Sequence, residues 1–236
     1  MRSESYMEGL SPVLRKIKFN LKQTESPLRL ILVILLCLFI LPVQAADKPL
    51  SAFKKLSCPE KKWVLFHPFV ARKAFKASQT AREKSDELAK SDELDRDANG
   101  GQVDAFRHSF WMALMSQKMC PAKAIRLGKA HEKGDYIRFK KKQLEDTALP
   151  DSVSSVMDLY NNKVGAKTGC ENPQLTENEL SKLLILKVKA GEMKIIRKDS
   201  KGNALDCDRN PIPVERYTGK WGIPKCLIPS GNGSIK

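Results

Sequence analysis

Apolar residues recur along most of the chain with the 3.6-residue period of an α-helix, and stretches that alternate as in a β-strand are short. The pattern predicts helices at residues 69–94 and 102–119, a third from Pro121 until Gly134 ends it, a fourth opened by Pro150-Asp151-Ser152 and stopped by Gly165, and a fifth from the capping box Thr176-x-x-Glu179 to a C-cap at Gly191. Within residues 102–119 apolar side chains cover almost every side, so we expect a central, buried helix there.

The segments around these helices are less regular. We expect residues 46–66 to be an irregular lead-in that ends in a strand-like patch at Trp63–Phe66, and residues 138–147 to be a basic linker. Met193–Arg197 and Ala204–Leu205 flank a Lys201-Gly202-Asn203 turn, which predicts a short hairpin. The fold class is therefore mainly α. We expect a bundle-like single domain with a lead-in (46–66), a helical body with a small C-terminal β-hairpin (67–206), and an irregular tail (207–236).

The first 45 residues have the organisation of a signal peptide. A basic segment precedes an unbroken apolar run from Leu30 to Leu41, Pro42 ends the run, and Val43-Gln44-Ala45 supplies the small residues that a signal peptidase reads. A helix over this run reaches only about 18 Å, which is short of the ~30 Å hydrocarbon core of a bilayer. We expect cleavage near Ala45 and a periplasmic or secreted protein. An inner-membrane anchor is the alternative, because the basic segment is unusually long.

The charge of the chain favours an anionic partner. Its 236 residues are 42% apolar and 29% charged, with a formal net charge of +15. Removing residues 1–45, which hold six basic and three acidic residues, leaves +12. Export directs this charge toward a lipid headgroup or a cell-wall polymer, and nucleic acid is not expected because no motif of a known reader is present.

The cysteines favour disulfides rather than a zinc module. No Cys-x-x-Cys pair or Cys/His finger spacing is present. After cleavage five cysteines remain, which in an oxidising compartment permits two disulfides and one thiol: Cys58, Cys120, Cys170, Cys207 and Cys226. The pairing stays open at this point, although Cys207 and Cys226 bracket a Pro- and Gly-rich tail that a disulfide would staple.

Charged residues inside the most apolar segment indicate a site. Asp104, Arg107, His108 and Trp111 stand at i, i+3, i+4 and i+7, which places them on one face of the central helix. An Asp one turn before a His can fix its tautomer and raise the basicity of the other ring nitrogen, which suits a general base or a metal ligand. Arg107 is suited to hold a phosphate or a carboxylate. An ion pair that only orders the helix is the alternative.

The next two helices continue this theme. His131 and Glu132 lie in the third helix, and Asp158, Asn161 and Asn162 lie about one turn apart in the fourth. Two Asn residues are unfavourable inside a helix, so they suggest a ligand, a metal or an interhelical hydrogen-bond network. Capping is the simpler explanation for His131 and Asn162.

The sequence resembles a family of mostly exported bacterial proteins classed as a domain of unknown function. The resemblance covers about residues 67–200. It is carried by Gly-Gly-x-x-Asp-Ala-Phe-Arg-His-x-x-Trp (100–111), Ala-His-Glu (130–132) and Met-Asp-Leu-Tyr-Asn-Asn-x-x-Gly (157–165). It implies that the motif positions are Asp104, Arg107, His108, His131, Glu132, Asp158, Asn161 and Asn162. It implies no reaction.

Two hypotheses for the function follow. The first is an envelope hydrolase, possibly metal-dependent, that acts on a phosphodiester, a phospholipid or an acidic glycan. Its expected catalytic residues are His108, Asp104, His131 and Glu132, its substrate-binding residues are Arg107, Trp111, Asn161 and Asn162, and its metal ligands are His108, His131 and Asp158. Zinc is the favoured metal, since two His and a carboxylate match a catalytic zinc set.

The second hypothesis is a non-catalytic periplasmic binding or structural protein, in which the same side chains form a buried hydrogen-bond network.

The order His108, His131-Glu132, Asp158 is similar to that of helical metal-dependent phosphohydrolases, although Glu132 stands where those have Asp. Serine hydrolases, nucleotide triphosphatases and dehydrogenases are not expected, because their Gly-x-Ser-x-Gly, phosphate-loop and dinucleotide motifs are missing from the sequence.

Overall fold

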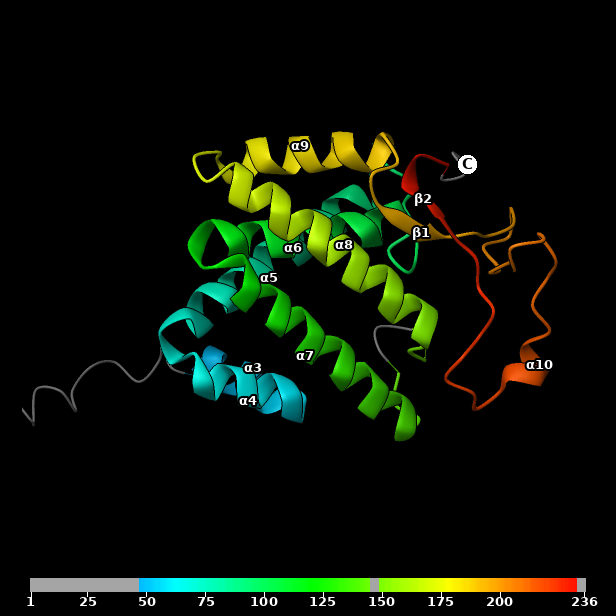
Figure 1. Cartoon of the computed structure of the whole chain (residues 1–236), viewed down its shortest axis with the longest axis horizontal. Helices are drawn as coiled ribbons and strands as arrows, with labels where there is room; N and C mark the ends of the chain where they lie inside the picture. Colours follow the sequence, from blue (N-terminus) through cyan, green and yellow to red (C-terminus); the bar gives the residue numbers. More distant parts are fainter. Residues whose placement is uncertain (1–46, 145–148, 233–236) are drawn as a thin grey trace, which may run out of the picture. The chain divides into compact units, whose positions relative to one another are not determined.

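The computed structural model describes residues 47–144 and 149–232 (Figure 1). The expected signal peptide lies outside the described residues. The chain divides into two units, 1–50 and 51–236, and the description below concerns the second. Its elements are α3 (Asp47–Lys55, which begins in the first unit), α4 (Cys58–Phe66), α5 (Pro68–Leu88), α6 (Gln102–Lys118), α7 (Pro121–Lys140), α8 (Ser152–Glu171), α9 (Glu177–Lys189), β1 (Lys194–Ile196), α10 (Val214–Tyr217), β2 (Leu227–Pro229) and the 3-10 turn η2 (Ser230–Asn232).

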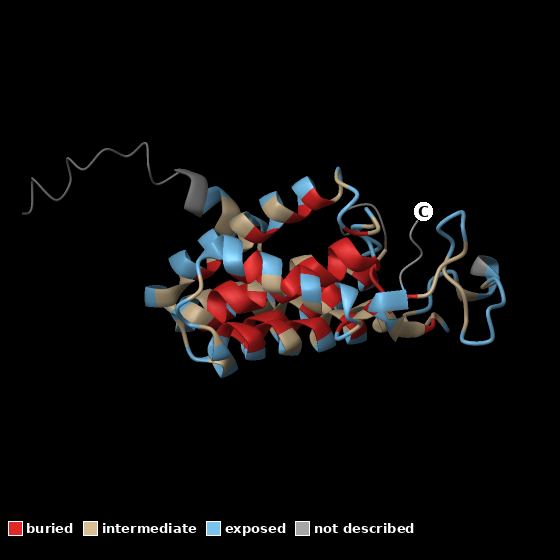
Figure 2. Ribbon diagram, turned by 90° about the horizontal axis from the view of Figure 1, so that it is seen from above, coloured by how far each residue is buried: buried red, intermediate tan, exposed pale blue. Residues whose placement is uncertain are grey.

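The mainly helical fold class is confirmed, with a small two-stranded antiparallel sheet near the C-terminus. Helix α6 lies at the centre and packs against α5, α7, α8, α9 and β1 (Figure 1). Its side chains are buried on nearly every side, as the sequence pattern predicts, and Figure 2 shows the buried residues concentrated along the inner helices. Among the described residues, no helix combines the length and apolar character needed to cross a membrane.

The prediction of an irregular lead-in is wrong, because helices α3 and α4 occupy most of this segment. Helix α4 begins at a capping box in which Ser57 and Glu60 bond each other, and Pro59 stands in its first turn, where a missing N–H costs nothing. Trp63 is buried and donates its indole N–H to the carbonyl of Lys123 at 3.1 Å. The apolar run around Trp63 is therefore one buried side and one exposed side of a helix, not a strand.

Two helices continue through glycines that were expected to end them. Helix α7 runs past Gly134 to Lys140, and α8 runs past Gly165 to Glu171. A Cβ at Gly134 would lie 2.5 Å from the Ser57 hydroxyl, and a Cβ at Gly165 would lie 2.0 Å from the carbonyl oxygen of Ser109. Both glycines are therefore sites of close approach by a neighbouring segment, and the basic linker expected from residue 138 begins after Lys140.

The small sheet has a different partner from the expected one. Strand β1 pairs with β2, with Ile195 opposite Ile228, whereas the Lys201–Asn203 turn closes only an isolated bridge between Lys198 and Ala204. A disulfide joins Cys207 to Cys226, immediately before β2. Of the other described cysteines, Cys58, Cys120 and Cys170 are unbridged and exposed. The tail is thus stapled, and the staple brings β2 to β1.

Candidate functional site

Side chains from α6, α7 and α8 converge on one small pocket with a volume of about 60 Å³. The charged and imidazole groups that line it are Asp104, Arg107, His108, Glu132, Asp135, Asp151, Asp158 and Lys225. His131 lies beside them, with its ring centroid 6.3 Å from that of His108. The structure therefore brings together the charged residues that the sequence singled out on three separate helices.

Asp104 is held by the start of its own helix. Its carboxylate accepts the backbone N–H of Gly100 at 2.7 Å and a guanidinium N–H of Arg107 at 2.5 Å. Gly100 has a φ of 84°, a conformation that suits glycine, and this turn aims its N–H at the carboxylate. Burial would raise the pKa of Asp104, but the positive charges of Arg107 and His108 and these hydrogen bonds outweigh it and lower the pKa. Asp104 is therefore an anion in this site.

His108 lies between two carboxylates from different helices. Its Nε2 is 3.5 Å from Asp104 Oδ1 and 3.6 Å from Asp158 Oδ1 of α8. Burial, together with the negative charges of Asp104 and Glu132, raises the pKa of Asp158 well above its usual value. Ligand atoms about 2.0–2.1 Å from a tetrahedral zinc ion lie about 3.3 Å from one another. Two separations, from His108 Nε2 to each carboxylate, are close to this value, and the ligand atoms of Asp104, His108 and Asp158 all lie within 4.8 Å of one another, so the three side chains form a candidate group for one divalent cation.

His131 is oriented by a residue from α4. Its Nδ1 donates to Glu60 Oε1 at 2.9 Å, and its Nε2 lies 3.9 Å from Asp135 Oδ2. Burial would raise the pKa of Glu60, but the hydrogen bond and charge of His131 and the hydrogen bonds from Ser57 lower it to about 2. An ionised Glu60 fixes the ring so that Nε2 faces the pocket side, as carboxylates do for metal-bound or catalytic imidazoles. His131, Glu132 and Asp135 form a second group whose ligand atoms lie within 4.8 Å of one another.

The carboxylates outnumber the permanent cations of the site. Five acidic side chains line the pocket, whereas three permanent cations pair with them: Arg107 contacts Asp104, Arg138 contacts Asp135, and Lys225 contacts Asp151. Such an excess of buried negative charge must be neutralised by protons or by a bound cation. The raised pKa of Asp158 is the local sign of this excess.

Helix α8 reaches the site because two glycines let it lie close to α6. A Cβ at Gly165 would be 2.0 Å from Ser109 O, and a Cβ at Gly169 would be 2.1 Å from Ala113 O. Asp158 stands seven residues before Gly165 and so lies on the same side of the helix. Gly165, which was expected to end the helix, is therefore what sets the distance between Asp158 and His108.

The two asparagines have different places. The amide of Asn161 bonds both the N–H and the carbonyl of Lys194, each at 2.9 Å, and so ties β1 to α8. Asn162 is fully buried beside Gly128, and neither atom of its amide has a hydrogen-bond partner among the described residues. Trp111 was also expected to bind substrate. Its ring packs edge-on against that of His131, with 5.7 Å between the ring centroids.

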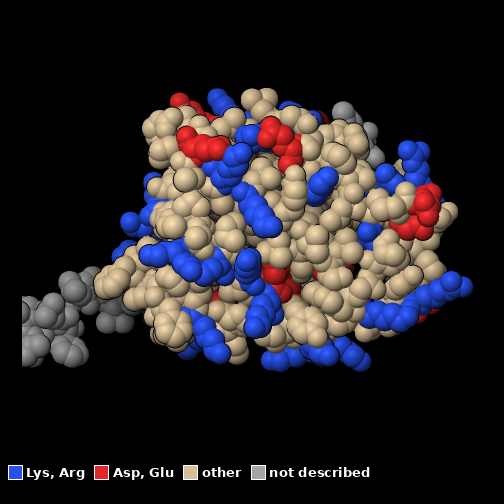
Figure 3. Space-filling view, in the orientation of Figure 1, with Lys and Arg blue, Asp and Glu red and all other residues tan. Residues whose placement is uncertain are grey.

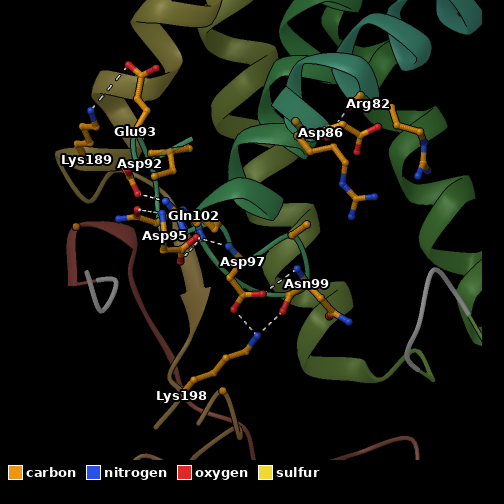
Figure 4. A pocket seen from close by; sticks show the side chains of 17 residues that line it. Arg82, Asp86, Asp92, Glu93, Asp95, Asp97, Asn99, Gln102, Lys189 and Lys198 are labelled. Atoms are coloured by element: carbon orange, nitrogen blue, oxygen red, sulfur yellow. Dashed lines mark hydrogen bonds and ion pairs between the residues drawn. The ribbon is translucent and has the colours of Figure 1, made fainter. Parts of the chain in front are cut away.

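A larger cleft of about 1280 Å³ adjoins the small pocket (Figure 4). Ala98, Asn99 and Arg107 line both. In this cleft Lys198 reaches Asp97 and the carbonyl of Asn99, both at 2.5 Å, from the opposite wall. Arg107 therefore stands at the junction between an open cleft and the carboxylate–imidazole groups.

Sequence reasoning missed Glu60 and Asp135. A signal was present for both: Glu60 completes the Ser57-x-x-Glu60 capping box, and Asp135 follows His131 by four residues. The capping box was hidden by the expectation of an irregular lead-in, and Asp135 by the expectation that Gly134 ends the helix.

The fold and the site together define a helical domain with an internal site of carboxylates, imidazoles and guanidinium groups. The chain belongs to the family described as Domain of unknown function (DUF6973), whose family model matches residues 61–192, more than half of its length. The matched range contains both groups of candidate ligands. No curated protein and no solved structure matches the chain.

Proposed function

We propose that the protein is an exported, metal-dependent hydrolase that acts on an anionic envelope substrate such as a phosphodiester, a phospholipid or an acidic glycan. The observation that carries the proposal is the meeting of two imidazoles and four carboxylates, from three helices, at a pocket with more acid than base. A divalent cation held by these residues would offset the excess of negative charge, and it would supply hydrolysis with a Lewis acid and an activated water.

Asp104, His108 and Asp158 would hold the cation. They combine one imidazole with two carboxylates, and their spacing fits zinc. The set differs from the expected His108, His131 and Asp158, since His131 lies with Glu132 and Asp135. A catalytic zinc keeps one position for water or substrate, and three protein ligands leave that position open.

The remaining residues would handle the proton and the substrate. His131, fixed by Glu60, and Glu132 both belong to α7 and would act as general acid and base. Arg107 is placed to bind the anionic group of a substrate that enters from the large cleft. Figure 3 shows basic side chains scattered over the illustrated face and acidic ones in fewer places, and the net charge of +12 that remains without residues 1–45 would attract such substrates.

Export is part of the proposal. The basic and apolar segments before Ala45 have the order of a signal peptide, and the Gly-Gly-x-x-Asp-Ala-Phe-Arg-His motif is that of the mostly exported family that the sequence resembles. The Cys207–Cys226 disulfide supports an oxidising compartment.

The test is metal content paired with hydrolysis. Protein purified from an exporting host is dialysed against zinc, its bound metal is counted by mass spectrometry, and hydrolysis of bis(p-nitrophenyl) phosphate and of anionic phospholipid is followed. We expect one zinc per chain, lost in His108→Ala and Asp158→Asn, with activity reduced at least about hundredfold. Asp208→Asn, an exposed carboxylate in the tail, serves as the control that keeps both.

A non-catalytic binding or structural protein is the second candidate, and the ion pairs of Arg107 with Asp104 and of Arg138 with Asp135 favour it. In that case the network is complete without metal. A wild-type protein that binds no zinc, and whose Asp158→Asn variant is folded and unchanged in every substrate assay, would establish it in place of the hydrolase.

A further inference from the structure

The corner between α4 and α5 exposes three large apolar side chains. Leu65, Phe66 and Phe69 are 67%, 81% and 94% exposed. Helix α4 cannot turn them inward, because its other side is fixed by buried Trp63 on the carbonyl of Lys123 and by Glu60 on His131. The exposed tip is therefore a consequence of how α4 is anchored.

Basic side chains continue from this tip along the same helix faces. On α4, Lys62 precedes Leu65 and Phe66 by three and four residues, so the three side chains share a face. On α5, exposed basic residues follow Phe69 at i+3, i+4 and i+7: Arg72, Lys73 and Lys76. From Ser51 to Arg82 the chain holds a single acidic residue, Glu60, and it is buried. The apolar tip is thus surrounded, within its own elements, by basic charge.

This combination fits an anionic lipid surface. Aromatic and aliphatic side chains enter the boundary between headgroups and acyl chains, while Lys and Arg bind the headgroups, and each basic residue near such a surface strengthens binding about fivefold. A stable protein partner buries about 800 Å² on each side, and three side chains on a convex corner offer much less. A cell-wall polymer offers the charge but no apolar interior.

We infer that the α4–α5 corner docks the protein on an anionic membrane surface by inserting Phe66, Phe69 and Leu65 between lipid headgroups. The inference is separate from the proposed hydrolase, because the residues of the corner lie outside the metal-binding groups. In this arrangement Lys62, Arg72 and Lys73 would bind the anionic headgroups around the inserted side chains.

A tryptophan probe at the corner tests the inference. The exported protein carries either Phe66→Trp or Leu186→Trp, the latter at an exposed leucine of α9 that serves as the matched control. Each is mixed with vesicles of phosphatidylglycerol and phosphatidylcholine, with and without brominated acyl chains. We expect a blue shift and bromine quenching for Phe66→Trp and neither for Leu186→Trp, after subtraction of the parent spectrum. Equal behaviour of the two probes would overturn the inference.

Two sets of substitutions separate the corner from the overall charge. Phe66→Ala with Phe69→Ala should weaken vesicle binding about tenfold or more. Replacing Lys62, Arg72 and Lys73 by Gln should weaken it about a hundredfold. The same change of net charge at Lys163, Lys167 and Lys182 of α8 and α9 should weaken it no more than about twofold. Equal losses from both charge sets, or sedimentation with an acidic glycan but not with vesicles, would overturn lipid docking at this corner.

Discussion

Replacing Gly165 by Ala should separate α8 from α6. A Cβ there would lie 2.0 Å from Ser109 O, whereas ordinary van der Waals contact begins at 3.4 Å, so the helices must move apart by about 1.4 Å. A gap of about 1 Å already forfeits up to about half of a dispersion contact, and overpacking a core typically costs about 1–3 kcal/mol. Alanine returns about 1 kcal/mol of helix propensity. We expect a net loss of about 2 kcal/mol in the free energy of unfolding, the upper end of the difference between these terms, since the obstructing atoms belong to the backbone.

Urea unfolding followed by circular dichroism measures this loss. The control is Gly222→Ala, at which the nearest atom to a new Cβ is the Ser152 hydroxyl at 4.0 Å. Because Asp158 lies on the same side of α8, zinc binding should weaken along with stability in Gly165→Ala and remain unchanged in the control. A Gly165→Ala protein as stable as the control would show that α6 and α8 do not approach this closely, and the distance between Asp158 and His108 would lose its explanation.

Three further changes test the site and the tail. Glu60→Gln should lower the free energy of unfolding by up to about 3 kcal/mol at pH 7, because a carboxyl whose pKa is lowered to about 2 stabilises the fold above its unfolded pKa and loses this effect as the pH falls toward 2. Urea unfolding of the variant and the parent should differ less at pH 3 than at pH 7, and an equal difference at both pH values would contradict this prediction. The pKa of Asp158 is raised, so the folded state loses stability as the pH rises through that pKa. Asp158→Asn should therefore raise the melting temperature of the metal-free protein by about 2–4 °C at pH 8 and leave it unchanged at acid pH. A melting temperature at pH 8 equal to or below that of the parent protein would contradict the excess of negative charge in the pocket. Reducing the Cys207–Cys226 disulfide should lower the free energy of unfolding of the tail by about 3 kcal/mol, and it should increase hydrogen exchange in the tail while the helices stay protected. Unchanged exchange in the tail would show that the tail keeps its structure without the disulfide.

The central helix was predictable from sequence because its own residues determine it. A run from Gln102 to Lys118 that is apolar on nearly every side has to be buried, and the charged residues in it have to share a face. That Asp104, Arg107 and His108 form one site is therefore a local property. Their meeting with Asp158 is not, because it depends on how closely two helices pack.

Glycines account for most of what the sequence could not give. A glycine inside a helix weakens it when nothing else is known, so Gly134 and Gly165 are reasonable ends. In the structure each accommodates a neighbour, the capping Ser57 in one case and the backbone of Ser109 in the other. Only the tertiary contact distinguishes the two meanings.

The strand that pairs with β1 could not be predicted from neighbouring residues, because this pairing also depends on a tertiary contact. The nearby turn at Lys201–Asn203 predicts pairing with the residues that follow it, whereas the observed partner, β2, is 31 residues further along and is brought near by a disulfide. Pairing at this distance leaves no mark on the periodicity of either strand.

The start of α6 is supported by a residue that lies far along the chain. Gln102, at the start of α6, donates its amide to the carbonyl of Ser230, 128 residues away, and the hydroxyl of Ser230 bonds the end of α9. Contacts between such distant positions form late, since a long loop must close before they can contribute. A chain that is synthesised N-terminus first can form its helices early, but the start of α6, and with it Asp104, gains this contact only after Ser230 has been made. The order of synthesis thus makes completion of the site one of the last events in the folding of the chain.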